Sequence, residues 1–246
     1  MTNIPLLSRL KTALRIIRGE ENLFPSHGKM AIRDRLREIK SRVTNHQPLI
    51  IDGGANLGSV TDVLLGYYPS ATIHAFEPIP QLADALRAKY AHRPNVMIHA
   101  KALGAEPKTL TFHQLNNVDS SSFLTPSAIK KKYHGQKVAV SNELAVEQVR
   151  LDDVVDGNID ILKLDLQGYE MEALKGAERS LPSTKLILIE VEFIPLYENQ
   201  PLFGDIDVFL RERGFFLLNL YELWTHPDGQ LTSGDAIYLN SRYFKP

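Results

Sequence analysis

The chain of 246 residues contains no cysteine. Without thiols it cannot form disulfides, thiolate metal sites or a cysteine nucleophile, which is consistent with a reducing compartment. It also lacks any run of about 20 apolar residues, the length that a membrane-spanning helix needs. The 28 basic side chains nearly balance the 29 acidic ones, for a net charge of -1. That balance gives no electrostatic reason to expect nucleic acid or an anionic membrane as a partner. We therefore expect a cytoplasmic protein without a transmembrane segment.

The sequence does have a regular alternation of apolar segments of strand length with segments of helical periodicity. Strands are expected over 48–52, 72–77, 96–100, 159–165, 185–193, 215–221 and 236–239, and helices over 58–68, 80–90, 169–179 and 203–213. Near-continuous apolar strands separated by helices are typical of a parallel sheet covered on both faces. A hairpin turn at Pro227-Asp228-Gly229 should make the last strand antiparallel. The predicted fold class is α/β, with a Rossmann-like, doubly wound, mostly parallel sheet.

Two segments depart from this alternation. Residues 4–18 carry apolar groups at helical spacing with basic residues on the other face, and a second helix is expected over 30–43. Residues 105–150 interrupt the pattern and include Lys130-Lys131-Lys132, which is typical of a solvated face. We interpret 1–46 as an N-terminal helical extension and 47–246 as the main domain. The main domain then carries an insertion over about 105–150 with an extra strand or two.

The most informative segment is the turn after the first strand, Asp52-Gly53-Gly54-Ala55-Asn56-Leu57-Gly58. Glycines let the backbone approach a ligand closely, and the helix that follows offers unpaired N–H groups. Glu77 and Pro78 end the second strand, and a carboxylate at this place can accept hydrogen bonds from two ribose hydroxyls. This spacing predicts a site for an adenosine-containing cofactor. The dinucleotide-binding pattern G-x-G-x-x-G would need glycine at position 55, where this chain has alanine.

Further blocks of sequence accompany this turn. They are Ala75-Phe76-Glu77-Pro78, Ala102-Leu103-Gly104, Ile161-Leu162-Lys163-Leu164-Asp165-Leu166-Gln167-Gly168-Tyr169-Glu170, Leu174-Lys175-Gly176-Ala177-Glu178, Ile189-Glu190-Val191 and Pro195-Leu196-Tyr197-Glu198-Asn199-Gln200-Pro201-Leu202-Phe203. Together these blocks resemble the FkbM family of class I S-adenosylmethionine-dependent methyltransferases over roughly residues 48–240, and the stretch from Asp165 to Glu170 is the most specific. The resemblance implies a seven-stranded sheet with an antiparallel last strand and S-adenosyl-L-methionine as cofactor. It also implies O-methylation of a hydroxyl on a sugar, glycolipid or natural product.

The resemblance further implies where the cofactor would lie. Asp52 would sit under its methionine portion, the backbone of Gly54 to Gly58 beneath the ligand, and Glu77 on its ribose. The expected cofactor-binding residues are Asp52, Gly53, Gly54, Ala55, Asn56, Gly58, Glu77, Pro78, Leu103 and Asp165. No spacing of His, Asp or Glu demands a metal ion, so no metal ligand is assigned.

Four residues are candidates for chemistry at the acceptor hydroxyl. Asp165 ends the fourth parallel strand, beside the crevice where ligands of open α/β sheets bind, and its alternative role is a helix N-cap. The resemblance supports Glu190, an acid in an otherwise apolar strand, whereas Glu192 can be explained as solvated beyond the sheet edge. His134, which together with His113 flanks the insertion near the expected cleft mouth, is a candidate general base whose alternative is a plain surface role, and His113 is open to the same two interpretations.

Other interpretations stay open at this point. Glu170 either accompanies Asp165 at the cofactor or favours its helix by sitting in the first turn. His74 and His99 lie inside strands, where a structural role is expected. A non-catalytic cofactor-binding partner subunit would keep the cofactor site without an acceptor, and a nicotinamide-dependent oxidoreductase would bind a dinucleotide instead. The expected partner is a small-molecule or glycan hydroxyl acceptor and not nucleic acid, while the oligomeric state is open to a homo-oligomer.

Overall fold

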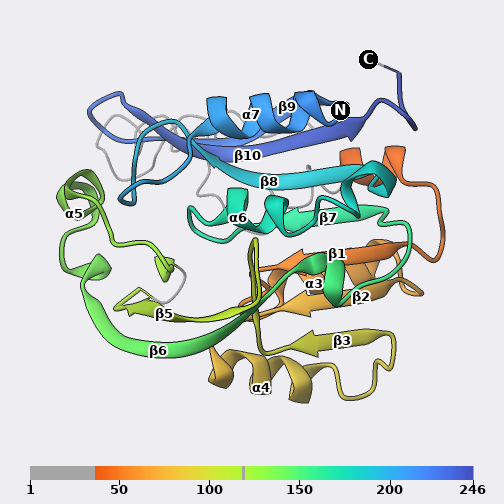
Figure 1. The fold of residues 1–246 in the computed structure, drawn as a ribbon, viewed down its shortest axis with the longest axis horizontal. Coiled ribbons are helices and arrows are strands. Elements are labelled where there is room, and N and C mark those ends of the chain that lie inside the picture. Colours follow the sequence, from red (N-terminus) through yellow and green to blue (C-terminus); the bar gives the residue numbers. More distant parts are fainter. Residues whose placement is uncertain (1–36, 118–119, 246) are drawn as a thin grey trace, which may run out of the picture.

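A computed structural model describes residues 37–117 and 120–245. Its core is a seven-stranded sheet in the order β3-β2-β1-β7-β8-β10-β9 (Figure 1). The strands are β1 Leu49–Gly53, β2 Thr72–Phe76, β3 Val96–His99, β7 Ile161–Leu164, β8 Leu186–Glu192, β9 Phe215–Thr225 and β10 Leu231–Asn240. Strand β10 is antiparallel to both β8 and β9, and the remaining neighbours pair in parallel. The predicted α/β class, with a mostly parallel seven-stranded sheet and an antiparallel last strand, is confirmed.

Strand β1 holds the central place in this arrangement. Ile50 and Ile51 are fully buried, as expected of a parallel strand with both faces covered. Because β2 and β7 flank β1, the winding of the chain reverses beside it, and the register sets Asp52 opposite Ala75 on one side and Lys163 on the other. The carboxyl ends of strands at such a reversal form the crevice in which open α/β sheets bind ligands.

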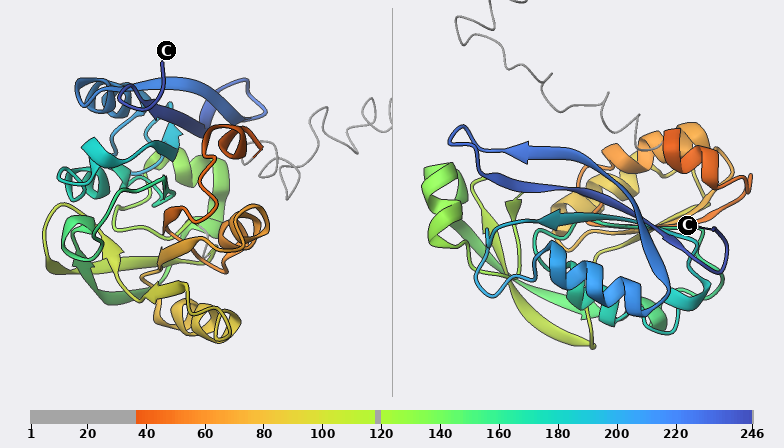
Figure 2. Two further views of the ribbon diagram at one scale, coloured as in Figure 1. Left: turned by 90° about the vertical axis from the view of Figure 1, so that its right-hand side faces the viewer. Right: turned by 90° about the horizontal axis from the view of Figure 1, so that it is seen from above.

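Helices cover the two faces of the sheet, as the view from above in Figure 2 shows. Helices α3 Ser59–Tyr67 and α4 Pro80–Lys89 contribute to one apolar cluster, and α6 Glu170–Lys175 and α7 Phe203–Glu212 contribute to the other. Helix α4 starts at Pro80, as predicted, because proline has no N–H to leave unsatisfied in a first turn. The sheet is thus the middle layer of three.

The two C-terminal strands are longer than the sequence predicts. Strands were expected over 215–221 and 236–239, whereas β9 reaches Thr225 and β10 begins at Leu231, with the predicted turn at 227–229 between them. Strand β10 leaves β8 at the pair Ser233 and Glu192 but continues to pair with β9 as far as Leu231 and Thr225. This distal part of the hairpin lies past the sheet, where side chains need not be apolar, so the hydropathy pattern misses it.

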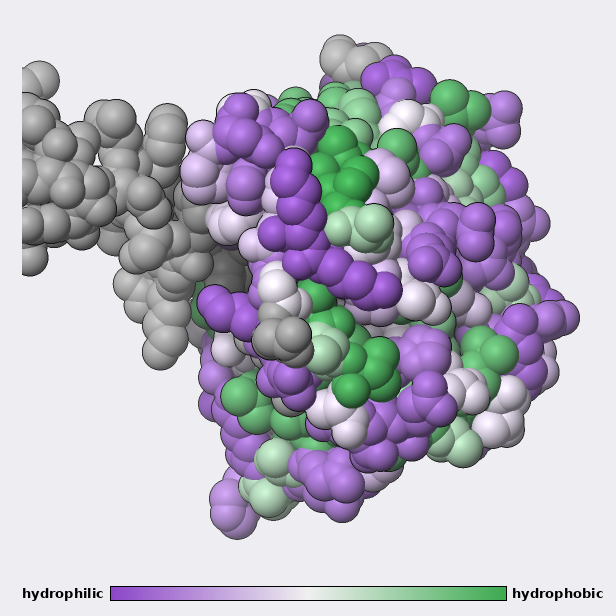
Figure 3. All heavy atoms as spheres, turned by 90° about the vertical axis from the view of Figure 1, so that its left-hand side faces the viewer, coloured by the Kyte–Doolittle hydropathy of each residue, from purple (hydrophilic) through white to green (hydrophobic). Residues whose placement is uncertain are grey.

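The segment 105–150 contributes to a second, three-stranded sheet and forms a short helix. Strands β4 Ala102–Leu103, β6 Val140–Val149 and β5 Lys108–Leu115 lie in the order β4-β6-β5, and α5 Ala128–His134 stands between β5 and β6 in the chain. In Figure 1, α5 lies beyond the end of the main sheet, on the side of the β9–β10 turn. Figure 3 views the molecule from this end, where separate apolar patches lie among hydrophilic residues.

The prediction that Lys130 belongs to a solvated face is wrong. Only 3% of this residue is exposed, and its ammonium group lies 3.5 Å from the centre of the Tyr197 ring. Lys131 and Lys132 are exposed as expected. Helix α5 turns one of three consecutive lysines inward because successive helical residues point in different directions.

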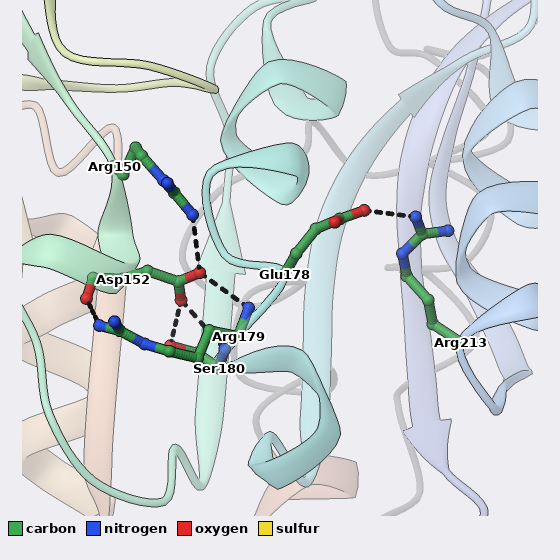
Figure 4. Close-up of polar contacts among 6 residues, drawn as sticks. All are labelled: Arg150, Asp152, Glu178, Arg179, Ser180 and Arg213. Atoms are coloured by element: carbon green, nitrogen blue, oxygen red, sulfur yellow. Dashed lines mark hydrogen bonds and ion pairs between the residues drawn. The ribbon is translucent and has the colours of Figure 1, made fainter.

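A buried acid fastens the end of the insertion to the segment after α6 (Figure 4). Asp152 accepts hydrogen bonds from the backbone N–H groups of Arg179 at 2.7 Å and Ser180 at 3.0 Å, and from the Ser180 hydroxyl at 2.6 Å. Its carboxylate also pairs with Arg150 at 3.5 Å, and the Arg179 guanidinium donates to its backbone carbonyl. Asp152 is 1% exposed, so this network is a fixed joint between two parts of the chain.

The N-terminal predictions fall mostly outside the described residues. Residues 37–42 are helical and belong to the helix expected over 30–43, while the helix expected over 4–18 lies entirely in the undescribed part. Within the part of the chain that the structure describes, no helix has the length and apolar character needed to cross a membrane.

Candidate active site

The turn after β1 is built around backbone conformations that ordinary residues avoid. Gly54 has a φ of 74°, and a Cβ at this position would overlap the carbonyl oxygen of Asp165. Asn56 has a φ of 49°, and asparagine is one of the few side chains that adopts this left-handed conformation at low cost. The turn therefore comes close to the end of β7, with α3 beginning directly behind it.

Glu77 holds this turn from the end of β2. Its Oε2 accepts a hydrogen bond from the backbone N–H of Asn56 at 2.8 Å, and its Oε1 accepts one from Ile79 at 2.9 Å. The side chain is buried, and burial raises the pKa of Glu77, while the two backbone N–H groups and Lys163 oppose that rise. Each carboxylate oxygen keeps one lone pair free of these bonds, so the group can still accept from ligand hydroxyls.

Lys163 supports the same turn from β7. Its ammonium group donates to the carbonyl oxygens of Gly53 at 2.9 Å and Gly54 at 2.8 Å and pairs with Asp52 at 3.0 Å. Burial favours the neutral amine, but Asp52 and Asp165 outweigh it and raise the pKa of Lys163. Asp52 also accepts from the Thr61 hydroxyl at 2.6 Å. The buried ion pair thus fixes the two glycine carbonyls from behind.

A single pocket of about 340 Å³ joins the turn, Glu77 and the end of β7. Its walls come from the main sheet and from the insertion. The lining residues are Gly54, Ala55, Asn56, Leu57, Ser59, Val60, Phe76, Glu77, Pro78, Ile79, Leu82, Lys101, Ala102, Leu103, Phe112, Ser121, Phe123, Lys163, Asp165, Leu166, Gln167 and Tyr169. This volume falls in the range of small-molecule and cofactor sites.

The insertion closes the pocket with aromatic rings. Phe112 of β5 meets Phe123 edge-on at 5.0 Å between ring centres, and Phe123 meets Tyr169 at 4.9 Å. Phe112 also belongs to an apolar cluster with Ile79, which precedes α4, and Ala102 of β4. The rings therefore anchor the second sheet over the pocket and supply flat apolar surface to whatever it holds.

Beside the pocket, carboxylates from β8 and α6 gather in a buried position. Glu170 sits in the first turn of α6 and accepts from the backbone N–H of Leu166, and burial raises its pKa to about 7. Burial, followed by the nearby acids, also raises the pKa of Glu190 and Glu192. Glu192 is 3% exposed, so the expectation that it is solvated beyond the sheet edge is wrong. The loops after β8 and the insertion cover this end of the strand.

Lys130 of α5 faces these acids from the insertion. Burial lowers the pKa of its ammonium group to about 8, and the carboxylates of Glu190, Glu192 and Glu170 oppose that fall. The chain thus places one cation, shielded by the Tyr197 ring, beside a group of acids at the end of β8. Such an arrangement lowers the cost of burying like charges together.

The structure brings most of the residues singled out from the sequence to the pocket. Those that line it are Gly54, Ala55, Asn56, Glu77, Pro78, Leu103 and Asp165. Asp52, Gly53 and Gly58 do not line the pocket but belong to the turn that forms its wall. Glu190 does not line it either, but it accepts a hydrogen bond from Gln167, which does. His134 is apart from the pocket lining: its ring stacks on Trp224 of β9 at 6.0 Å, and burial and Lys130 lower its pKa.

His74 and His99 have the structural role expected of them. His74 Nδ1 lies 3.0 Å from His99 Nε2, and the His99 ring stacks on Phe76 at 4.4 Å. Burial, followed by the neighbouring His74, lowers the pKa of His99 to about 4, so this ring stays neutral. Because Phe76 lines the pocket, the pair supports its wall from behind.

Sequence reasoning missed several residues of the site. A buried ion pair at Lys163 could have been predicted, since a lysine inside an apolar parallel strand needs a buried partner. Phe112 and Phe123 gave no signal, because their position over the pocket beside Tyr169 depends on how the second sheet folds back. Among the described residues, no cluster of three or more His, Cys, Asp or Glu side chains has metal-binding geometry.

Comparison with known proteins places this arrangement in a family. Residues 52–217 match the family described as Methyltransferase FkbM domain. The 2-O-methyltransferase NoeI of Sinorhizobium fredii is 30% identical over 182 residues, which cover 70% of this chain and 75% of NoeI. Methyltransferase sdnD of Sordaria araneosa is 29% identical over 195 residues, covering 68% of this chain and 73% of its own.

A solved structure has the same fold. The crystal structure of methyltransferase FkbM from Methylobacillus flagellatus superposes with a TM-score of 0.52 at 15% sequence identity. The match covers 79% of this chain but only 44% of that longer chain. The family match argues against the alternative that the protein is a nicotinamide-dependent oxidoreductase. The chain belongs to the FkbM methyltransferase family and is an S-adenosylmethionine-dependent methyltransferase.

Proposed function

We propose that this protein transfers a methyl group from S-adenosylmethionine to a hydroxyl oxygen of a sugar, glycolipid or natural product. One observation carries the proposal: the glycine turn, the Glu77 carboxylate and the Asp165 carboxylate share the walls of one pocket. The relative NoeI, at 30% identity, is named a 2-O-methyltransferase, which supports oxygen as the accepting atom. The same pocket has an aromatic wall from the insertion, which can contact the acceptor.

The residues present fit this cofactor. The turn at Gly54 leaves no room for a Cβ, so its backbone packs directly against the residue that follows β7, Asp165. Glu77 offers free lone pairs for two ribose hydroxyls, and Ile79, Leu82 and Leu103 offer apolar surface near it for a base. The bound group supplies an electrophilic methyl on a sulfonium, so the protein has chiefly to hold and orient the reactants.

Asp165 is the proposed group at the acceptor hydroxyl. As the hydroxyl oxygen forms its bond to the methyl carbon, the carbon–sulfur bond breaks and S-adenosylhomocysteine leaves, while the hydroxyl proton passes to a base within hydrogen-bond reach. The Asp165 carboxylate lines the pocket at the end of β7, with Glu190 close behind it. We assign Asp165 the proton and Glu190 a supporting place, and His134 has no pocket contact that would favour it.

The finer assignments belong to the same proposal. We take residues 47–246 as the catalytic domain and 1–46 as an extension, since the family match and the pocket lie within the former. A cytoplasmic site of action is supported by the absence of cysteine, and a small-molecule or glycan acceptor in place of nucleic acid by the net charge of -1.

The proposal is tested in two stages. First, thermal unfolding is followed with S-adenosylmethionine, S-adenosylhomocysteine and NAD. A ligand at about 100 times its dissociation constant stabilises by ~2.7 kcal/mol, a shift of roughly 5–11 °C for a chain of this size. We expect this shift with the first two ligands and none with NAD.

Second, transfer of a radioactive methyl group is measured with panels of sugars, glycolipids and polyketides. Wild type and Asp165→Asn are compared, and we expect the variant to lose about 10²–10⁴-fold in turnover. A shift with NAD alone would refute the cofactor assignment. Full turnover by Asp165→Asn would remove Asp165 from the reaction.

A further inference from the structure

Gln167 occupies the bend that follows β7 in an unusual conformation. Its φ is 54°, in the left-handed region that glutamine rarely adopts. The residue lines the pocket next to Asp165 and Leu166. Strained backbone of this kind persists only where surrounding contacts hold it, and it is often found where a side chain has to be aimed.

The amide nitrogen of Gln167 joins two carboxylates. It donates to Asp165 Oδ1 at 3.2 Å and to Glu190 Oε2 at 2.7 Å. An amide NH₂ has two hydrogens, so a single group can serve both acceptors. Asp165 belongs to the pocket and Glu190 does not, which puts Gln167 between the pocket and the acids of β8.

The two oxygen atoms of Gln167 are hydrogen-bonded to segments that cover the pocket. The Tyr197 hydroxyl, from the loop after β8, lies 3.0 Å from Gln167 Oε1 and 2.6 Å from the carbonyl of Ser120. The Ser122 hydroxyl of the insertion donates to the Gln167 carbonyl at 2.8 Å. The amide cannot rotate without losing these contacts, so its two N–H groups stay directed at the acids.

Two carboxylates in a poorly solvated place repel each other, and without a shared donor they would move apart or one would take up a proton. We propose that Gln167 is a positioning residue that holds Asp165 and Glu190 in register at the acceptor end of the pocket. The proposal rests on the proposed methyl transfer for its purpose. The effect of the Gln167 amide on the two carboxylates can, however, be measured without an acceptor.

The test uses carboxyl-labelled protein and three variants. Gln167→Met keeps the length and shape of the side chain but has no donor, and Gln167→Glu replaces the donors with a third acid. Gln230→Met, at the β9–β10 turn, is the matched control on an exposed glutamine. Carbon-13 NMR follows the carboxyl resonances of Asp165 and Glu190 from pH 5 to 10, and thermal unfolding is recorded for each variant. Glu192, Glu170, Asp235 and Lys130 act on the same acids, so each variant is compared with wild type rather than read alone.

We expect Gln167→Met to raise the titration midpoint of at least one of the two acids by half a pH unit or more, because the ionised form loses an N–H donor. The midpoints in Gln230→Met should match those of wild type. Unchanged midpoints in folded Gln167→Met overturn the proposal. If Gln167→Met does not fold, Gln167→Glu decides by the same criterion, since a third acid must also raise a midpoint.

Binding of S-adenosylhomocysteine, measured by calorimetry, separates this inference from the proposed function. We expect its dissociation constant to stay within about threefold of wild type in Gln167→Met. Absence of binding in wild type would refute the cofactor assignment and leave the NMR result on Gln167 standing. With an acceptor in hand, kcat should fall at least tenfold in Gln167→Met while KM for S-adenosylmethionine is unchanged. A purely structural role predicts instead that both values follow the loss of folded protein.

Discussion

Replacing Glu77 with glutamine should separate cofactor binding from folding. The two oxygens of Glu77 accept the backbone N–H groups of Asn56 and Ile79, and each has one lone pair left for a ribose hydroxyl. In Glu77→Gln one oxygen becomes an NH₂ group, which cannot accept from ribose and faces one of the two backbone N–H groups. A hydrogen bond to a charged group contributes about 1.5–3 kcal/mol, and 1.4 kcal/mol is a factor of ten. The dissociation constant of S-adenosylhomocysteine should therefore rise about 10–150-fold.

The stability of the free protein should change less than the binding. An N–H group left without a partner costs about 1–3 kcal/mol. Removal of the buried charge offsets part of this cost, since burial raises the pKa of Glu77 and so disfavours its ionised form. The two effects oppose each other, and the unfolding temperature without ligand should move by a few degrees at most.

Calorimetry and thermal unfolding give the readout. At a ligand concentration that is about 100 times the wild-type dissociation constant, the wild type gains ~2.7 kcal/mol, whereas a variant that binds about 30-fold more weakly gains ~0.9 kcal/mol. The ligand-dependent shift should thus fall to about one third. Glu212→Gln is the matched control, because Glu212 ends α7 with 70% of its side chain exposed. A dissociation constant for Glu77→Gln within threefold of wild type would refute this account of the site.

Three further predictions concern the turn, the joint at Asp152 and the buried acids. Gly54→Ala should abolish S-adenosylhomocysteine binding in calorimetry, since its Cβ would overlap the Asp165 carbonyl. Gly66→Ala, with open space around its Cβ, should bind normally, and equal affinities of the two variants would contradict this prediction. Asp152→Asn should lower the free energy of unfolding in urea by about 3 kcal/mol, because it leaves buried N–H donors unpaired. Asp153→Asn, at an exposed position, should lower it by less than about 1 kcal/mol. An equally small loss in Asp152→Asn would show that the Asp152 network does not stabilise the fold. In the folded protein Glu170 keeps its proton up to about pH 7, whereas in the unfolded chain it loses the proton above about pH 4.3. The contribution of Glu170 to the free energy of unfolding therefore falls as the pH rises from about 4.3 to about 7. Urea midpoints from pH 5 to 8 should fall less steeply in Glu170→Gln than in wild type, and parallel slopes would rule out this assignment.

The part of the pocket formed by the glycine turn and Glu77 could be predicted because its determinants are local. The turn from Gly53 to Gly58 and the acid at the end of the next strand are each fixed by a few neighbouring residues. The positive φ at Gly54 and Asn56 agrees with the residue types found there. The alternation of strands and helices likewise predicted a mostly parallel sheet covered on both faces, since near-continuous apolar strands separated by helices are typical of that arrangement.

The surroundings of the acids at the end of β8 could not be predicted in the same way. Whether Glu192 is solvated or buried depends on the loop after β8 and on the insertion, which come from other parts of the chain. Lys130 looks like its two neighbours in sequence, and only its position on α5 against Tyr197 distinguishes it. The hydropathy pattern predicts the secondary structure of a segment and which of its faces is buried, but it does not predict which distant segment will cover it.

The backbone at Gln167 shows that one side chain at the pocket is kept although its conformation lowers stability. Among the described residues with positive φ that are not glycine, Asn56 and Gln167 both line the pocket. The left-handed conformation costs roughly 1–2 kcal/mol for most residues, and glycine would remove that cost. At position 167 the side chain instead bonds two acids, whereas asparagine at position 56 adopts the conformation at low cost. The same bend that costs stability at Gln167 is therefore what places its amide between Asp165 and Glu190, so strain and function at this point have one structural origin.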